Sequence, residues 1–191
     1  MTVDKELRGL QTISPEGEKR FMYGMEKNGN FHMIADPDKD LSKDLVQGEI
    51  ILAEGYATGA TLHMATEKPV AVAFDAGNLE PVAKKLREKF PNAAITICAD
   101  NDHKHTRKTP DGVEHWNKGV ELAQRAAQEV GGKVVVPIFT DEERGKGLTD
   151  FNDLHQSRGM DEVKRQVGLV LQKDVEREKG QDRGKARELS L

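Results

Sequence analysis

Two patterns of hydrophobic and polar positions divide this chain near residue 48. From there on, short apolar runs alternate with longer segments that carry apolar residues at helical spacing. The expected strands are Glu49–Ala53, Val70–Phe74, Ala94–Ala99 and Lys133–Phe139. The expected helices are Thr58–Thr66, Leu79–Phe90, Asn117–Val130 and Met160–Leu171. This alternation with short connections predicts an α/β fold, with a mostly parallel sheet, right-handed crossovers and helices on both faces.

The first part of the chain has a different, purely strand-like pattern. Three short runs, Leu10–Ile13, Lys19–Tyr23 and Phe31–Ile34, are separated by two groups of turn-forming residues. One of these groups contains Asn28-Gly29, a strong signal for a β-hairpin. We therefore predict a three-stranded antiparallel meander, which needs to pack on the domain that follows because so small a sheet is not stable alone.

Composition and charge set the expected domain bounds and exclude several classes of protein. We expect a β meander with its connector at 1–47, a catalytic domain at 48–171 and a charged, flexible tail at 172–191. The net charge of −4 excludes a chain that binds nucleic acid through its overall charge, so any such contact needs a local basic patch. A single cysteine, Cys98, excludes internal disulfides and is expected to be buried in its strand. We find no apolar run long enough for a membrane span and no signal peptide, which favours a soluble, cytoplasmic protein.

Acidic residues follow two of the predicted parallel strands. Glu54 ends the first strand, and Asp100 and Asp102 come directly after the third. Because the carboxyl ends of parallel strands open on one edge of the sheet, these side chains should converge there. Clustered carboxylates repel one another unless cations or protons neutralise them, and Mg²⁺ prefers oxygen ligands. We therefore expect a divalent-metal site suited to phosphate chemistry, with Gly55 leading into a helix whose N-terminus favours a phosphate.

A later run, Thr149-Asp150-Phe151-Asn152-Asp153, can bring two more carboxylates to the same edge. Asp150 and Asp153 are either metal ligands or supporting groups there, or one of them caps the turn that follows, which is a common role for aspartate.

Basic residues that could contact nucleic acid or a nucleotide occur in two places. Lys104, Arg107 and Lys108 lie in what we expect to be an irregular loop from about residue 103 to 116. Lys19 and Arg20 could form a second basic patch beside the site. Alternating histidines at the start of that loop suggest zinc only weakly, since no cysteine or clear third ligand accompanies them.

Four short motifs carry a resemblance to a known family. The segments Glu54-Gly55-Tyr56-Ala57-Thr58-Gly59-Ala60, Phe74-Asp75-Ala76-Gly77-Asn78-Leu79, Ala99-Asp100-Asn101-Asp102 and Thr149-Asp150-Phe151-Asn152-Asp153-Leu154 occur in this order. Together with the βα alternation they resemble the Toprim domain, and within that family the Toprim region of plasmid- and phage-type DNA primases, including conjugative ones. The resemblance covers about residues 7 to 167 and implies a Rossmann-like fold.

The resemblance also implies roles for the matched residues. Glu54 would act as general acid/base or organise a metal, and Asp100 and Asp102 would bind Mg²⁺ or Mn²⁺. Asp150 and Asp153 match the acidic motif nearest the C-terminus. The implied reaction is RNA primer synthesis from nucleoside triphosphates on a single-stranded DNA template, in replication or transfer of a plasmid or other mobile element.

Two alternatives use the same fold. A Toprim nuclease would employ the same carboxylates with water as the nucleophile, and a non-catalytic module would only bind nucleic acid or help to assemble a larger primase or relaxase. The sequence has no Cys/His zinc module. A relaxase, a helicase or another primase subunit is therefore the expected partner for template binding.

Overall fold

A five-stranded mixed sheet forms the centre of the molecule. The computed structural model describes residues 1–2, 4, 6–38, 45, 48–104 and 106–171. Its strand order is β3-β5-β4-β6-β9. These strands are β3 (His32–Ile34), β4 (Glu49–Ala53), β5 (Val70–Val72), β6 (Ala94–Cys98) and β9 (Lys133–Val135). All neighbouring pairs are parallel except β3 with β5, so the predicted mostly parallel α/β sheet is confirmed.

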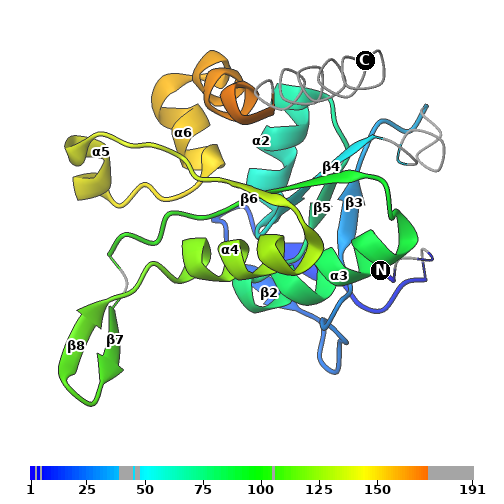
Figure 1. The fold of residues 1–191 in the computed structure, drawn as a ribbon, viewed down its shortest axis with the longest axis horizontal. Coiled ribbons are helices and arrows are strands. Elements are labelled where there is room, and N and C mark those ends of the chain that lie inside the picture. The colour runs from blue at the N-terminus through cyan, green and yellow to red at the C-terminus, as the bar shows by residue number, and fades with distance from the viewer. Residues whose placement is uncertain (3, 5, 39–44, 46–47, 105, 172–191) are drawn as a thin grey trace, which may run out of the picture.

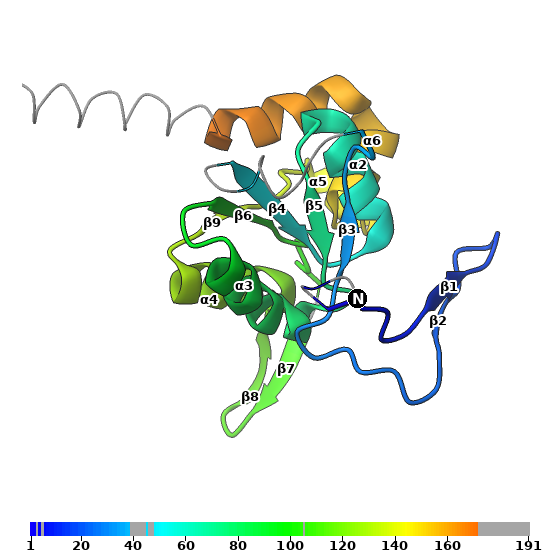
Figure 2. The same cartoon turned by 90° about the vertical axis from the view of Figure 1, so that its right-hand side faces the viewer.

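Helices cover both faces of this sheet, as the alternating pattern predicts. The helices are α2 (Tyr56–Thr66), η1 (Ala76–Asn78), α3 (Leu79–Lys89), α4 (Lys118–Val130), α5 (Asp141–Lys146) and α6 (Phe151–Arg158), followed by a helix over residues 160–171. Figure 2 shows α3 and α4 on one face and α2 and α6 on the other. In Figure 1 the chain winds through the layers in this order from blue to orange.

The core consists of two apolar clusters, one on each side of the sheet. Strand β4 supplies both, because Ile50 and Leu52 belong to the α3/α4 side whereas Ile51 and Ala53 belong to the α2/α6 side. Successive side chains of a strand point to opposite faces, so a continuous apolar run is what a strand buried on both faces requires. Cys98 lies in the second cluster and is fully buried, as expected.

The N-terminal segment differs from the predicted three-stranded meander. Strands β1 (Gln11–Ile13) and β2 (Lys19–Phe21) pair as an antiparallel hairpin, but the third strand, β3, pairs with β5 at the edge of the main sheet. The hairpin stands away from the body of the molecule (Figure 2). Pairing with β5 buries more apolar surface than pairing with an isolated hairpin, which explains why β3 joins the larger sheet.

The predicted irregular loop after β6 is a second hairpin. Strands β7 (Thr106–Thr109) and β8 (Gly112–His115) pair antiparallel across the turn at Pro110 and Asp111. This hairpin also extends from the body of the molecule, at the lower left of Figure 1.

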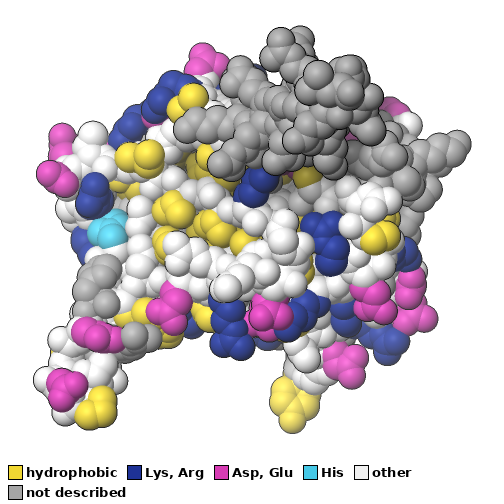
Figure 3. Space-filling model, viewed as in Figure 1, with side chains coloured by type: hydrophobic (Ala, Val, Ile, Leu, Met, Phe, Trp, Pro, Cys, Tyr) yellow, Lys and Arg dark blue, Asp and Glu magenta, His cyan; other side chains and the backbone are white. Residues whose placement is uncertain are grey.

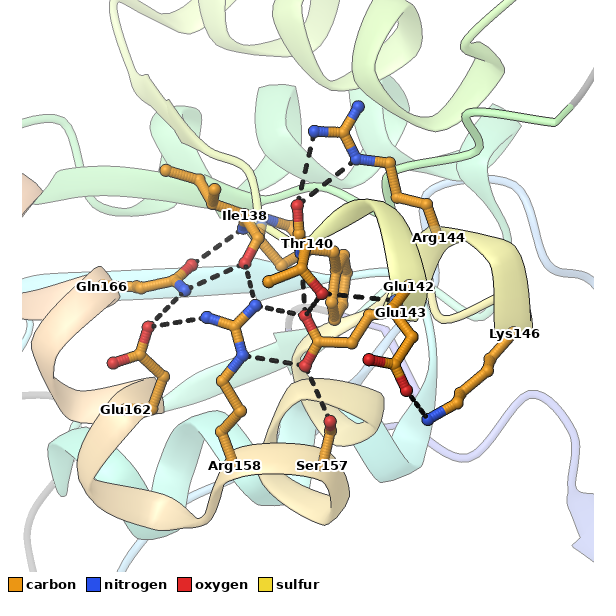
Figure 4. Close-up of polar contacts among 12 residues, drawn as sticks. Ile138, Thr140, Glu142, Glu143, Arg144, Lys146, Ser157, Arg158, Glu162 and Gln166 are labelled. Carbon is orange, nitrogen blue, oxygen red and sulfur yellow. Dashed lines mark hydrogen bonds and ion pairs between the residues drawn. The ribbon is translucent and has the colours of Figure 1, made fainter.

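A polar cluster holds the C-terminal helices together. We call it the Glu143 cluster, and it consists of Thr140, Glu143, Ser157, Arg158, Glu162 and Gln166. The Glu143 carboxylate accepts hydrogen bonds from the amide and hydroxyl of Thr140, the Ser157 hydroxyl and the Arg158 guanidinium (Figure 4). It therefore fastens α5 to α6.

Charges on the face seen in Figure 3 are interspersed rather than gathered by sign. On α3 and α4, for example, Glu80 pairs with Arg125 and Lys84 pairs with Glu129, at 2.9 and 3.0 Å. Within the described part of the chain, no helix is long and apolar enough to cross a membrane. The predicted tail at 172–191 and most of the predicted connector lie outside the described residues.

Candidate metal and nucleotide site

The acidic residues after β4 and β6 approach one another at the carboxyl end of the sheet. Strands β4 and β6 are direct neighbours, with Ala53 opposite Cys98, so the chain leaves both strands at the same level. Burial raises the pKa of Glu54, and the negative charges of Asp102 and Asp75 raise it further. Glu54 and Asp102, which are 48 positions apart in sequence, therefore share one electrostatic environment.

Asp100 is the most perturbed carboxyl group of this edge. Burial, followed by the charges of Glu54 and Asp150, raises its pKa to about 8, while Lys19 acts in the opposite direction. Its Oδ1 atom is buried, and no donor among the described residues bonds to it. Such an atom is costly in a folded protein unless something satisfies it, so Asp100 is the strongest single pointer to a bound cation.

Asp102 has a more structural position than Asp100. Its Oδ2 atom accepts a hydrogen bond from the Gly119 amide, 2.9 Å away, at the start of α4. A Cβ atom on Gly119 would clash with the carbonyl oxygen of Asp100, so only glycine lets α4 approach so closely. Asn117, which caps α4, also accepts a hydrogen bond from the Asp102 amide. Asp102 thus anchors α4 while its charge still acts on Glu54.

Asp150 and Asp153 form a capping box at the N-terminus of α6. Asp150 accepts a hydrogen bond from the amide of Asp153 at 2.8 Å, and Asp153 accepts one from the amide of Asp150 at 3.3 Å. The capping role that the sequence left open is therefore present. Asp150 also accepts a hydrogen bond from the Thr58 hydroxyl of α2, and its charge raises the pKa of Asp100. Asp150 thus lies at the edge of the site, whereas Asp153 bonds to the amides that precede α6.

Asn101 ties this acidic segment to two other loops at the same edge. Its amide donates to the carbonyl of Thr149 at 2.7 Å, and its side chain donates to the carbonyl of Pro137 at 3.0 Å. The middle residue of the Asp-Asn-Asp motif is thus a structural link, which its spacing alone does not indicate.

Of the two basic residues predicted on β2, one reaches the site. The Nζ atom of Lys19 lies 3.6 Å from the position that a Cβ atom on Gly55 would take, and its charge lowers the pKa of Asp100. Arg20 instead pairs with Glu18 at 2.9 Å on the surface of the hairpin. Hairpin β1–β2 therefore places one cation, Lys19, near Glu54 and Asp100. We call the end of the sheet that carries Glu54, Asp100, Asp102 and Asp150 the carboxylate edge.

The basic residues of the second hairpin have other surroundings. Lys104 donates to the carbonyl of Gly145 at 2.9 Å, which ties the base of hairpin β7–β8 to α5. Lys108 is exposed on β7, and the backbone of Arg107 lies on the same strand.

Three site residues received no role in the sequence interpretation, although two of them, Phe74 and Asp75, lie in one of its four motifs. Lys118, the first residue of α4, lowers the pKa of Glu54 and is therefore a second cation at the edge. Asp75 caps η1, pairs with Lys27 at 2.7 Å and raises the pKa of Glu54. Phe74 has a left-handed backbone, with φ of 71°, and its amide donates to the carbonyl of Glu54 at 2.7 Å. Such a conformation is unusual for a phenylalanine and marks this turn as one that the surroundings impose.

The donors at this edge fit a magnesium ion that is completed by its substrate. Among the described residues, no three His, Cys, Asp or Glu side chains converge closely enough to form a ready-made metal cage. Mg²⁺ usually binds through one or two carboxylates, with water and substrate phosphates as the other ligands. Asp100, whose Oδ1 has no partner among the described residues, and Glu54 nearby could provide such a pair of oxygen ligands.

Comparison with known proteins agrees with this arrangement. The family model of the Toprim domain matches residues 49–161, from β4 through α6. Two DNA primases named TraC, both from Escherichia coli, are 39% and 38% identical to the chain over 134 and 130 residues. The matched segments are 70% and 68% of this chain but only 9% and 11% of those relatives, so the chain spans about a tenth of their length. No solved structure matches the chain. With its sheet topology, its acidic strand ends and a family match over more than half of its length, the chain belongs to the Toprim domain family.

Proposed function

We propose that this chain is the nucleotidyl-transfer module of a primase, which joins ribonucleotides on single-stranded DNA with the help of Mg²⁺ or Mn²⁺. The observation that carries the proposal is the buried Oδ1 of Asp100, which has no partner among the described residues, at an edge that also holds Glu54. The similarity to two DNA primases supports the choice of reaction. We place the chain by analogy in the replication or transfer of a plasmid.

Asp100 and Glu54 would hold the cation, with Asp102 and Asp150 adding negative charge around it. When bound, the cation would neutralise charge on the reacting phosphates. The reaction joins the 3′-hydroxyl of one nucleotide to the α-phosphate of the next, and pyrophosphate leaves.

The N-terminus of α2 supports phosphate binding next to these carboxylates. Gly55 is its N-cap and provides no side-chain hydrogen bond, so amides of the first turn point outward without a cap. An uncapped helix N-terminus attracts anions, and Lys19 adds a full positive charge at the same place. We assign the triphosphate to this position, between Lys19 and Glu54.

Two hairpins provide the candidate contacts to a DNA strand. Hairpins β1–β2 and β7–β8 both stand out from the body of the molecule (Figure 2). We propose that Arg20 on the first, and Lys104, Arg107 and Lys108 on the second, contact phosphates of the template. Because the chain corresponds to about a tenth of its relatives, we also propose that a relaxase, a helicase or another primase subunit completes template binding.

The test is incorporation of labelled ribonucleotides on single-stranded DNA by wild type and by Asp100→Asn. A matched control is Asp161→Asn, which removes an exposed carboxylate on the last described helix. Metal binding is measured separately by calorimetric titration with Mg²⁺ or Mn²⁺. The proteins compared are wild type and the Asp100→Ala/Asp102→Ala double variant. We expect metal binding and RNA products from wild type and the control, and neither from the variants.

Other outcomes would change the assignment. DNA shortened in the absence of nucleotides would identify the nuclease alternative, and strand binding with neither metal binding nor products would identify a non-catalytic module. Metal binding without products would point to a missing partner subunit. Equal metal binding by wild type and the double variant would refute the metal site itself.

A further inference from the structure

A cavity of about 440 Å³ lies between the N-terminal arm and the start of α2. Its walls come from the N-terminal arm, from the turn before β3 and from the first residue of α2. We call it the arm cavity, and the side chains used below are Leu10, Asn30, His32, Tyr56 and Phe74. Its volume falls within the range of small-molecule sites, roughly 300–1,000 Å³, and such sites are mostly apolar with a few polar groups.

The position of the arm cavity links it to the catalytic edge. Tyr56 follows Glu54 by two residues, and the amide of Phe74 donates to the carbonyl of Glu54 at 2.7 Å. Gly55, with the uncapped end of α2 and the nearby Lys19 ammonium, lies between Glu54 and Tyr56. A molecule in the cavity with a phosphate tail would therefore reach both the helix N-terminus and the carboxylates.

The walls of the arm cavity present aromatic surfaces. The rings of His32 and Tyr56 lie 5.8 Å apart, and Tyr56 is 42% exposed even though it belongs to a packed helix. Nucleobases stack on such rings, with a gain of about 1–3 kcal/mol per base. Stacking uses the faces of a base and leaves its pairing edge available to a template.

One polar atom in the cavity wall has no partner among the described residues. Asn30 is only 5% exposed, and its amide nitrogen donates to the carbonyl of Glu26 at 2.9 Å. Its Oδ1 atom is buried and accepts no hydrogen bond from any described residue. A buried acceptor of this kind calls for a donor. This atom is closed off from solvent, so the Asn30 side chain has to turn for it to meet a donor in the cavity. Because the pairing edge of a base must stay free, a ribose hydroxyl is the donor that fits.

From these observations we propose that the arm cavity binds the nucleoside part of a nucleoside triphosphate, with its base on Tyr56 and its ribose at Asn30. This inference rests on the proposed function and adds where the substrate's base and sugar lie. The cavity recognises the nucleoside, and the edge formed by Lys19, Gly55 and the carboxylates recognises the triphosphate.

The test compares the affinities of ATP and of inorganic tripolyphosphate, both with Mg²⁺, by calorimetry. Wild type is expected to bind ATP about 10-fold more tightly than tripolyphosphate, the size of effect that stacking of one base produces. Tyr56→Ala should abolish this difference and leave tripolyphosphate binding unchanged, while Tyr56→Phe should preserve the difference. Met64→Ala, an exposed position on the same helix, is the matched control and should behave as wild type.

A second variant tests the opposite wall without touching the sheet. Leu10→Asn removes an apolar side chain from the cavity wall at a residue that is 54% exposed, without adding a charge, and it should also weaken ATP binding selectively. Equal affinities of wild type for ATP and tripolyphosphate would overturn the inference and leave the proposed function standing. An equal loss of affinity for both ligands in Tyr56→Ala would also overturn it. Failure of both ligands to bind wild type would overturn the phosphate site and the nucleoside site together.

Discussion

Two regions of this molecule bury carboxylates, and they treat them in opposite ways. In the Glu143 cluster, the Arg158 guanidinium and several hydrogen-bond donors surround Glu143 and hold its pKa far below the usual range. At the carboxylate edge, burial and like charges raise the pKa of Asp100 to about 8, and its Oδ1 has no partner among the described residues. The first arrangement stabilises the fold, whereas the second leaves an acid whose charge requires a ligand. The degree to which a buried acid is satisfied thus separates a structural carboxylate from a functional one.

The largest expected effect lies at the carboxylate edge. Asp100→Asn should reduce ribonucleotide incorporation by roughly 1000-fold, because it removes a charge on which stabilisation of the transition state depends. The same change should leave the thermal unfolding midpoint of the metal-free protein unchanged or higher, since it relieves a buried like-charge repulsion. A lower midpoint together with retained activity would reverse the roles assigned to the two regions.

Glu143→Gln should have the opposite profile. The change removes the charge on which hydrogen bonds from Thr140, Ser157 and Arg158 converge, and we expect the free energy of unfolding to fall by about 2 kcal/mol. Urea denaturation measures this change. Glu142→Gln is the matched control, because Glu142 is 79% exposed and its pair with Lys146 contributes little. Equal decreases in the free energy of unfolding for both variants would show that the Glu143 cluster contributes no more to stability than a surface ion pair.

The pH dependence of stability should also differ between the two regions. For Asp100, the folded-state pKa of about 8 lies above the unfolded value near 4, so the folded state binds more protons between these pH values. The free energy of unfolding of the metal-free protein should therefore fall as pH rises through this range, by on the order of 4 kcal/mol. Glu143 has a lowered pKa, so its contribution is present above pH of about 4.5 and is lost on acidification below it.

Denaturation in EDTA at about pH 5 and about pH 8 measures the first effect. Asp100→Asn should flatten the decline, and added Mg²⁺ should reduce it in wild type because a bound cation favours the charged carboxylate. If the wild-type protein became more stable between these pH values, the assignment of a raised pKa to Asp100 would be wrong.

The smallest expected effect concerns the cap of α5. Thr140 accepts a hydrogen bond from the amide of Glu143 at 3.3 Å within a capping box. Thr140→Ala should lower the free energy of unfolding by about 1 kcal/mol, and Thr140→Ser should largely restore it. Activity should not change in either variant. A loss of activity with Thr140→Ala would show that the Glu143 cluster supports the carboxylate edge and does not act on stability alone.

Local sequence patterns were sufficient to predict strands that are buried on both faces and helices with one apolar face. Strand β4 has the predicted bounds, Glu49–Ala53, because a continuous apolar run has no other favourable place than a sheet covered on both sides. The helix over residues 160–171 also follows the prediction, and Gly131 ends α4 in the left-handed conformation expected of a helix C-cap.

Patterns failed where pairing depends on distant partners or on polar strands. Strand β3 has the composition expected of a hairpin strand, but its partner, β5, lies 36 or more residues further along the chain. The β7–β8 hairpin has few apolar residues, so it lacks the alternation that signals a strand. Its Pro110-Asp111-Gly112 turn was the one available signal, since such a sequence favours a tight reversal.

By itself, then, the sequence of this protein determined the α/β class, most of the elements and the presence of acids at two strand ends, because these depend on local periodicity. Only the tertiary structure decided which acids are satisfied. Asp150 and Asp153 cap a helix, Asp102 holds Gly119, and Asp100 keeps one oxygen without a described partner. Lys19, Lys118 and Tyr56 join this edge from three separate segments. The physical reason is that burial and hydrogen bonding, which set the charge state of a carboxylate, depend on neighbours that sequence spacing does not specify.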